Sequence, residues 1–118
     1  MTRNIDILLF DDLNMLDVAG PVQAFEAANS AKSKPYAIRF VSFENKPIRA
    51  SCGLMLSPEA RFSSKGIGND LLIPGGGGVE QQIANPRILQ LLKKYNAGTG
   101  RIISVCSGAM VLAAAGVL

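Results

Sequence analysis

Apolar residues along the chain fall into short continuous runs that are separated by segments with helical spacing. The runs 4–10, 36–43, 70–73 and 101–105 are short and apolar or alternating, which predicts strands. The segments 16–29, 79–84, 86–97 and 107–116 predict helices between and after them. Strands that alternate with helices predict an α/β fold, with a mostly parallel sheet and helices on both of its faces.

Smaller signals predict how these elements begin and end. Pro21 is expected in the first turn of its helix, where a missing N–H costs nothing. Ile48–Ala50 and 54–56 predict a small hairpin, and the polar stretch 57–69 predicts a surface connection without regular structure. Gly98 is expected to end the third helix in a left-handed conformation.

Composition narrows the class of protein. The chain has 118 residues, enough for one domain, and its hydrophobic content of 48% excludes a disordered chain. The net charge is +3 and no basic run exceeds Lys93-Lys94, so we find no nucleic-acid footprint. Two distant cysteines and no histidine argue against a disulfide framework and against a metal site. No signal peptide or membrane span is apparent, so we expect a cytoplasmic protein that has no membrane partner.

Three features follow predicted strands at the carboxyl edge of the sheet, where ligands bind in open α/β folds. They are Asp17 after the first strand, the glycine loop after the strand 70–73, and Cys106 after the strand 101–105. Their shared position is the strongest physical argument for a site.

Cys106 lies where a β-branched strand stops and an Ala- and Leu-rich helix begins. Strand, reactive side chain and helix start, in that order, predict a nucleophile elbow, and small flanking residues allow the sharp turn. The helix N-terminus favours a thiolate at this place. The alternative is a buried cysteine that packs as a small hydrophobic side chain.

The glycine loop 75–78 lacks the spacing of a dinucleotide fingerprint and has no P-loop lysine, so no cofactor is expected. It is either a plain tight loop or an oxyanion hole, in which N–H groups of Gly75 or Gly76 act with that of Ser107. Asp17 is either a helix-capping carboxylate or an acidic partner of Cys106. Cys52, in the hairpin, is expected to be structural.

Five segments together resemble the DJ-1/PfpI superfamily, whose fold is flavodoxin-like and related to class I glutamine amidotransferases. They are Leu16-Asp17-Val18-Ala19-Gly20-Pro21, Phe25-Glu26-Ala27-Ala28-Asn29, Ser51-Cys52-Gly53-Leu54, Leu72-Ile73-Pro74-Gly75-Gly76 and Ser104-Val105-Cys106-Ser107-Gly108-Ala109. Two branches fit, the sensor domain of AraC-type transcriptional regulators and the isonitrile hydratases. The Ala-Ala-Asn helix end and the hairpin look more like the regulator branch.

The resemblance implies that Cys106 is the elbow nucleophile and Asp17 its acidic partner, with Gly75, Gly76 and Ser107 as oxyanion-type contacts. It also implies a homodimer. Residues 1–118 are expected to be the N-terminal part of the family domain, because members continue into further strands and usually a His-containing segment. No DNA-binding module is seen, so DNA contact is expected only through sequence outside this chain.

Three functions stay open at this point. The first is a domain that senses an unknown small molecule for an AraC-type regulator. The second is a cysteine-dependent hydratase or amidase that uses Cys106 and Asp17. The third is an oxidation-sensitive thiol protein.

Overall fold

A five-stranded parallel sheet forms the centre of the computed structural model, which describes residues 2–30 and 32–118. The strand order is β5-β2-β1-β6-β7, and every neighbouring pair runs parallel. The strands are β1 (Arg3–Leu9), β2 (Tyr36–Ser42), β5 (Ala60–Arg61), β6 (Asp70–Ile73) and β7 (Ile102–Ser104). The predicted parallel sheet is confirmed.

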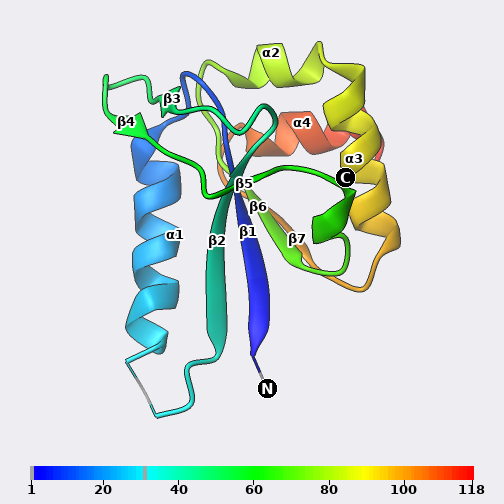
Figure 1. The fold of residues 1–118 in the computed structure, drawn as a ribbon. Coiled ribbons are helices and arrows are strands. Elements are labelled where there is room, and N and C mark those ends of the chain that lie inside the picture. The colour runs from blue at the N-terminus through cyan, green and yellow to red at the C-terminus, as the bar shows by residue number, and fades with distance from the viewer. Residues whose placement is uncertain (1, 31) are drawn as a thin grey trace.

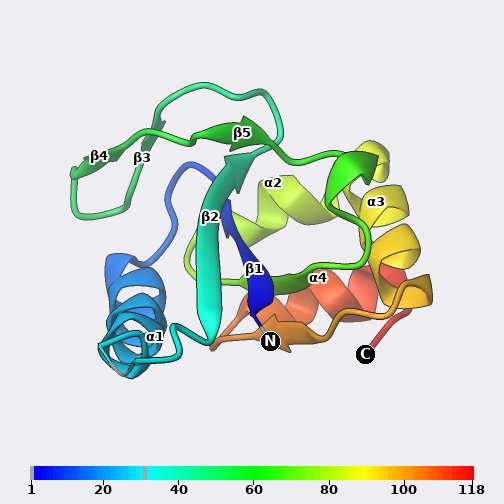
Figure 2. The same ribbon diagram turned by 60° about the horizontal axis from the view of Figure 1, so that its bottom comes forward.

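Helices cover both faces of the sheet (Figures 1 and 2). One face carries α1 (Met15–Ala28), and the other carries α2 (Val79–Ile83), α3 (Pro86–Ala97) and α4 (Gly108–Ala115). The predicted hairpin is also present, as the antiparallel pair β3 (Ile48–Arg49) and β4 (Met55–Leu56) beside the carboxyl edge. Among the described residues, no helix is long and apolar enough to cross a membrane.

The hydrophobic core lies where β1 and β6 meet the helices. Both strands are inner strands, and β6 is buried along its whole length. The face of α3 toward the sheet buries Ile88, Leu92 and Tyr95, and α4 adds Val111 and Leu112. Apolar side chains at helical spacing thus form one wall of the core, which is the arrangement that the sequence pattern predicts.

Two predicted helix boundaries are wrong. Pro21 lies inside α1 and not in its first turn, because the helix starts earlier, where the Asn14 side chain accepts a hydrogen bond from the Leu16 N–H at 3.2 Å. The ring of Pro21 therefore leaves the helix without one N–H bond. Gly98 ends α3 in an extended conformation, with φ −80° and ψ −174°, and not in the left-handed one.

The stretch predicted as an irregular connection contains regular structure. It forms β5, which pairs with the end of β2, and a 3₁₀ turn, η1 (Ser64–Gly66). Both are only two or three residues long, so no periodic pattern marks them in the sequence.

The amino edge of the sheet holds a buried carboxylate, Asp6, that is fully enclosed. Arg39 binds both of its oxygens at 2.9 Å, and the Tyr95 hydroxyl donates to Oδ2 at 3.0 Å. Burial, together with this carboxylate, raises the pKa of Tyr95 well above its usual range, so the hydroxyl remains a donor. The network ties β1 to β2 and to α3.

A second buried carboxylate, Asp70, lies in the next strand. Arg3 binds it through two nitrogens at 2.8 Å, and Arg101 adds its backbone N–H at 2.7 Å and its guanidinium at 3.0 Å. These hydrogen bonds, that of Arg3 first, hold the pKa of Asp70 well below its usual range despite burial.

This lowered pKa predicts a pH-dependent stability. A carboxyl whose pKa is lower in the folded state stabilises the fold above its unfolded pKa, about 4, and that contribution is lost as the pH falls further. The difference in unfolding free energy between wild type and Asp70→Asn should therefore be largest at neutral pH and shrink as the solution is acidified below about pH 5. Urea denaturation at a series of pH values measures it. A difference between wild type and Asp70→Asn that does not vary with pH would contradict the assignment.

Candidate functional site at the carboxyl edge of the sheet

The glycine loop after β6 is joined directly to the first turn of α1. The Gly75 N–H donates to Oδ2 of Asp17 at 3.0 Å, and the Asn14 N–H donates to the Gly75 carbonyl at 2.8 Å. The Asp17 side chain is buried, with 9% of its surface exposed. Asp17 therefore holds the loop in place from the neighbouring helix, and the α1 cap is Asn14 and not Asp17.

Only glycine fits at the first two positions of this loop. A Cβ on Gly75 would lie 2.6 Å from Oγ of Ser107 and 2.9 Å from Oδ2 of Asp17. Gly76 has φ +123°, a conformation that other residues rarely adopt, and faces the backbone of Asn14 at 2.6 Å. The loop is thus a close junction between three segments that are distant in the sequence.

The turn between β7 and α4 is sharp, and Cys106 lies at its corner. Cys106 has φ +53°, in the left-handed region, where a residue other than glycine costs on the order of 1–2 kcal/mol. Its side chain is exposed, which excludes the alternative of a buried packing cysteine. Strained backbone of this kind is commonly kept where it presents a side chain for function.

Ser107 connects the thiol corner to the glycine loop. Its Oγ accepts a hydrogen bond from the Gly76 N–H at 3.0 Å. The N–H groups of Gly75 and Gly76 therefore already have acceptors, and neither is free to meet a substrate oxygen. Among the described residues the Ser107 N–H has no acceptor, so it is the donor still available beside Cys106.

The structure thus brings four of the five predicted residues into contact and places the fifth beside them in the chain. Asp17, Gly75, Gly76 and Ser107 share hydrogen bonds or close approaches, and Cys106 directly precedes Ser107. The second cysteine, Cys52, is exposed in the loop between β3 and β4. We call the five residues the thiol corner.

The sequence model of the DJ-1/PfpI family matches residues 3–118. The chain belongs to the DJ-1/PfpI family. The resemblance drawn from the sequence motifs is therefore confirmed, and the flavodoxin-like fold with it.

Three comparisons place this DJ-1/PfpI domain among known proteins. It is 29% identical to the isonitrile hydratase of Pseudomonas putida over its whole length, which is 50% of that enzyme. It is 26% identical to the HTH-type transcriptional regulator GbdR of Pseudomonas aeruginosa, covering 98% of this chain and 32% of the regulator. The crystal structure of a ThiJ/PfpI family protein from Pseudomonas syringae superposes with a TM-score of 0.87 at 26% identity, covering all of this chain and 48% of that one. The chain thus spans about half or less of the length of each of these three proteins.

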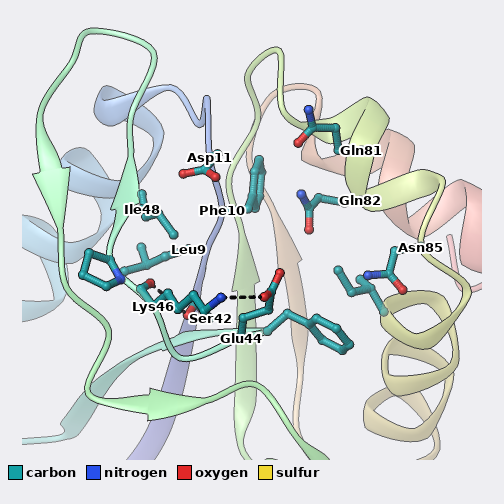
Figure 3. Close-up of a pocket in the computed structure, with 13 residues that line it drawn as sticks. Leu9, Phe10, Asp11, Ser42, Glu44, Lys46, Ile48, Gln81, Gln82 and Asn85 are labelled. Carbon is teal, nitrogen blue, oxygen red and sulfur yellow. Dashed lines mark hydrogen bonds and ion pairs between the residues drawn. The ribbon is translucent and has the colours of Figure 1, made fainter.

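A pocket of about 260 Å³ lies at the same edge of this DJ-1/PfpI domain, and Figure 3 shows the residues that line it. Gln81, Gln82 and Asn85 line one side of it, and Lys46, paired with Glu44 at 3.4 Å, lies on the other. None of the five predicted residues lines it. No motif in the sequence indicates this pocket. The adjacent amides Gln81 and Gln82, which come shortly after the glycine loop in the sequence, are a weak signal for it.

The acidic residues and cysteines among residues 2–30 and 32–118 are of the types that form the ligand sets that metal ions need. The described residues contain no group of three Cys, Asp or Glu side chains placed to hold an ion.

Proposed function

We propose that this domain senses a small molecule for a transcriptional regulator of AraC type, and that the molecule binds at the thiol corner. The observation that carries the proposal is the hydrogen bonding of the glycine loop. The Gly75 N–H donates to Asp17 and the Gly76 N–H donates to Ser107. These two hydrogen bonds hold the loop in one conformation, so the surface around the exposed thiol is rigid and preformed. A preformed surface suits reversible binding, whereas acyl-type chemistry needs free donors for a developing oxyanion.

The similarity to a transcriptional regulator supports the same proposal. The alignment with GbdR covers 98% of this chain, including the whole thiol corner. We propose that the full-length protein works as a cytoplasmic homodimer and contacts DNA through residues outside 1–118. Sequencing the gene beyond codon 118 tests this: a helix-turn-helix coding region is expected. A stop codon soon after a complete α/β domain would contradict the proposal.

A cysteine-dependent hydratase is the second candidate, which the exposed, strained Cys106 favours. In this reaction the S–H bond of Cys106 breaks as Sγ bonds to the carbon of an isonitrile, and the Asp17 carboxyl group carries the thiol proton to that carbon, which gives a thioimidate. Water then adds to the same carbon and the carbon–sulfur bond breaks. The product is an N-substituted formamide, and the thiol is regenerated.

Incubation of the full-length protein with an alkyl isonitrile separates the two functions. We expect binding without turnover, seen as a shift of the thermal unfolding midpoint and no formamide in the proton NMR spectrum. The shift should be lost in Cys106→Ala. Asp17→Asn keeps an oxygen acceptor for the Gly75 N–H, so it removes the carboxyl group while leaving the loop in place. Formamide release that disappears in both variants would establish the hydratase and overturn the sensor.

A further inference from the structure

A groove of about 730 Å³ runs between α3 and the segment that leads from β5 into η1. One wall consists of Arg61, Ser63 and Ser64, and the other of the exposed face of α3. It shares no residue with the thiol corner. We call it the cationic groove, because Lys46, Arg61, Arg87 and Lys94 line it and Glu44 is the one acidic residue in its lining.

The cationic groove carries the entire net charge of the chain. It holds four of the twelve basic side chains and one of the nine acidic ones, so the remaining eight of each sign cancel. The net charge of +3 is thus concentrated at one place. A concave surface lined by one sign of charge focuses the electrostatic field and attracts counter-ions.

Three of these cations have no acidic partner among the described residues. Lys46 pairs with Glu44 at 3.4 Å, but Arg61, Arg87 and Lys94 form no ion pair there. Three of the four arginines outside the groove are paired, since Arg3 and Arg101 bind Asp70 and Arg39 binds Asp6, whereas Arg49 forms no ion pair among the described residues. Buried carboxylates thus pair with arginines at the amino edge of the sheet, whereas no buried carboxylate lines the groove.

The floor and walls of the groove suit an organic molecule better than a bare ion. The half-buried side chains of Phe43 and Leu91 give it an apolar surface, whereas Phe62 is 1% exposed and belongs to the core. Arg87, Leu91 and Lys94 are four and three residues apart, so they share one face of α3. Arg87 and Lys94 are then separated by about 10 Å along the helix axis, at 1.5 Å per residue.

We propose that the cationic groove binds an organic polyanion with an aromatic body and adjacent phosphate groups, of the nucleoside diphosphate class. Arginine guanidinium groups bind phosphate oxygens through two parallel hydrogen bonds, and lysine adds a point charge. The apolar floor takes the aromatic body, and the volume falls in the usual range of about 300–1,000 Å³ for ligand sites. This site is separate from the thiol corner and does not depend on the function proposed for it.

Titration calorimetry at low ionic strength tests the proposal with ADP as the probe. ADP should bind, adenosine should not, and pyrophosphate should bind at least about tenfold more weakly than ADP, because it lacks the aromatic body. The affinity for ADP should fall steeply as salt is added. Pyrophosphate binding as tight as ADP, or no heat with ADP, would overturn the proposal.

Two neighbouring lysines on α3 provide a matched pair of variants. Lys94 lines the groove, whereas the exposed Lys93 beside it does not. Lys94→Glu should weaken ADP binding by about tenfold or more, and Lys93→Glu, with the same change in net charge, by less than about twofold. Equal losses of ADP affinity in the two variants would show that ADP is attracted only by the net charge of the protein. That result would contradict a specific site in the cationic groove. Circular dichroism of both variants verifies their fold.

Alkylation with iodoacetamide in a Cys52→Ser background, where Cys106 is the one remaining cysteine, separates this site from the thiol corner. Alkylated protein should bind ADP with unchanged affinity, since no residue of the corner lines the groove. Loss of ADP binding on alkylation would overturn the separate site, while an unchanged affinity leaves the sensor function to be judged by its own experiment.

Discussion

Asp6→Ala is expected to lower the free energy of unfolding by about 1–3 kcal/mol, the usual cost of removing one partner from a buried hydrogen-bonded group. The substitution leaves the buried Tyr95 hydroxyl with only the Ser63 carbonyl at 3.4 Å as an acceptor, and it leaves the Arg39 guanidinium, whose side chain is 35% exposed, without its carboxylate. Burying the Asp6 carboxylate is itself costly, so the pair as a whole adds little. The loss comes from the partners that are left behind.

Urea denaturation of wild type and variant measures this difference. Because a domain of this size has about 5–15 kcal/mol of stability, the alanine variant can be too unstable to purify. Tyr95→Phe is therefore a graded second variant, which removes only the hydroxyl and should cost about 1 kcal/mol. Glu26→Ala, on the exposed side of α1, should change little. If Asp6→Ala lowers the free energy of unfolding no more than Glu26→Ala does, the hydrogen-bond network around Asp6 contributes nothing to stability.

Gly108→Ala is expected to destabilise the fold by about 1–3 kcal/mol, although alanine is the better helix former by about 1 kcal/mol. A Cβ at this position would lie 2.3 Å from the Ile73 carbonyl oxygen and 2.8 Å from that of Pro74. Both oxygens belong to the backbone at the end of β6, so no side chain can rotate away. The start of α4 must shift instead, and Cys106 with it.

Gly77→Ala is the matched control, because nothing lies within 4 Å of its Cβ position. Thermal unfolding should separate the two variants by several degrees, with Gly77→Ala close to wild type. The rate at which iodoacetamide alkylates Cys106 should also change in Gly108→Ala alone. Equal behaviour of the two glycine variants would show that the approach of α4 to β6 is looser than described.

The parallel sheet was predictable because each main strand is a compact apolar run bounded by polar or glycine residues. The strand 70–73 matches β6 at both ends, and Gly116 ends α4 in a left-handed conformation with φ +75°, one residue after its last helical residue. The thiol corner was predictable in outline, since its members follow strands that end at one edge. Its hydrogen bonds were not, because the direction of the Gly75 and Gly76 N–H groups depends on side chains from other segments.

The buried charges at the amino edge were missed, although the sequence contains a signal for them. Asp6 stands between Ile5 and Ile7 in the middle of an apolar strand, and Asp70 opens another such strand. An acidic residue in a buried strand needs a cationic partner. Nothing in the sequence names that partner, since Arg39 is 33 residues from Asp6 and Arg3 is 67 residues from Asp70. The pairing is set by the strand order.

The position of β1 between β2 and β6 in the sheet also affects how the chain folds during translation. Both strands that flank it, β2 and β6, come later in the sequence, so the apolar β1 leaves the ribosome before either neighbour exists. At roughly 5–20 residues per second, β6 follows β1 only after several seconds. During that interval the strand has to be kept from pairing with other nascent chains, which makes this stretch a target for chaperones that bind apolar segments.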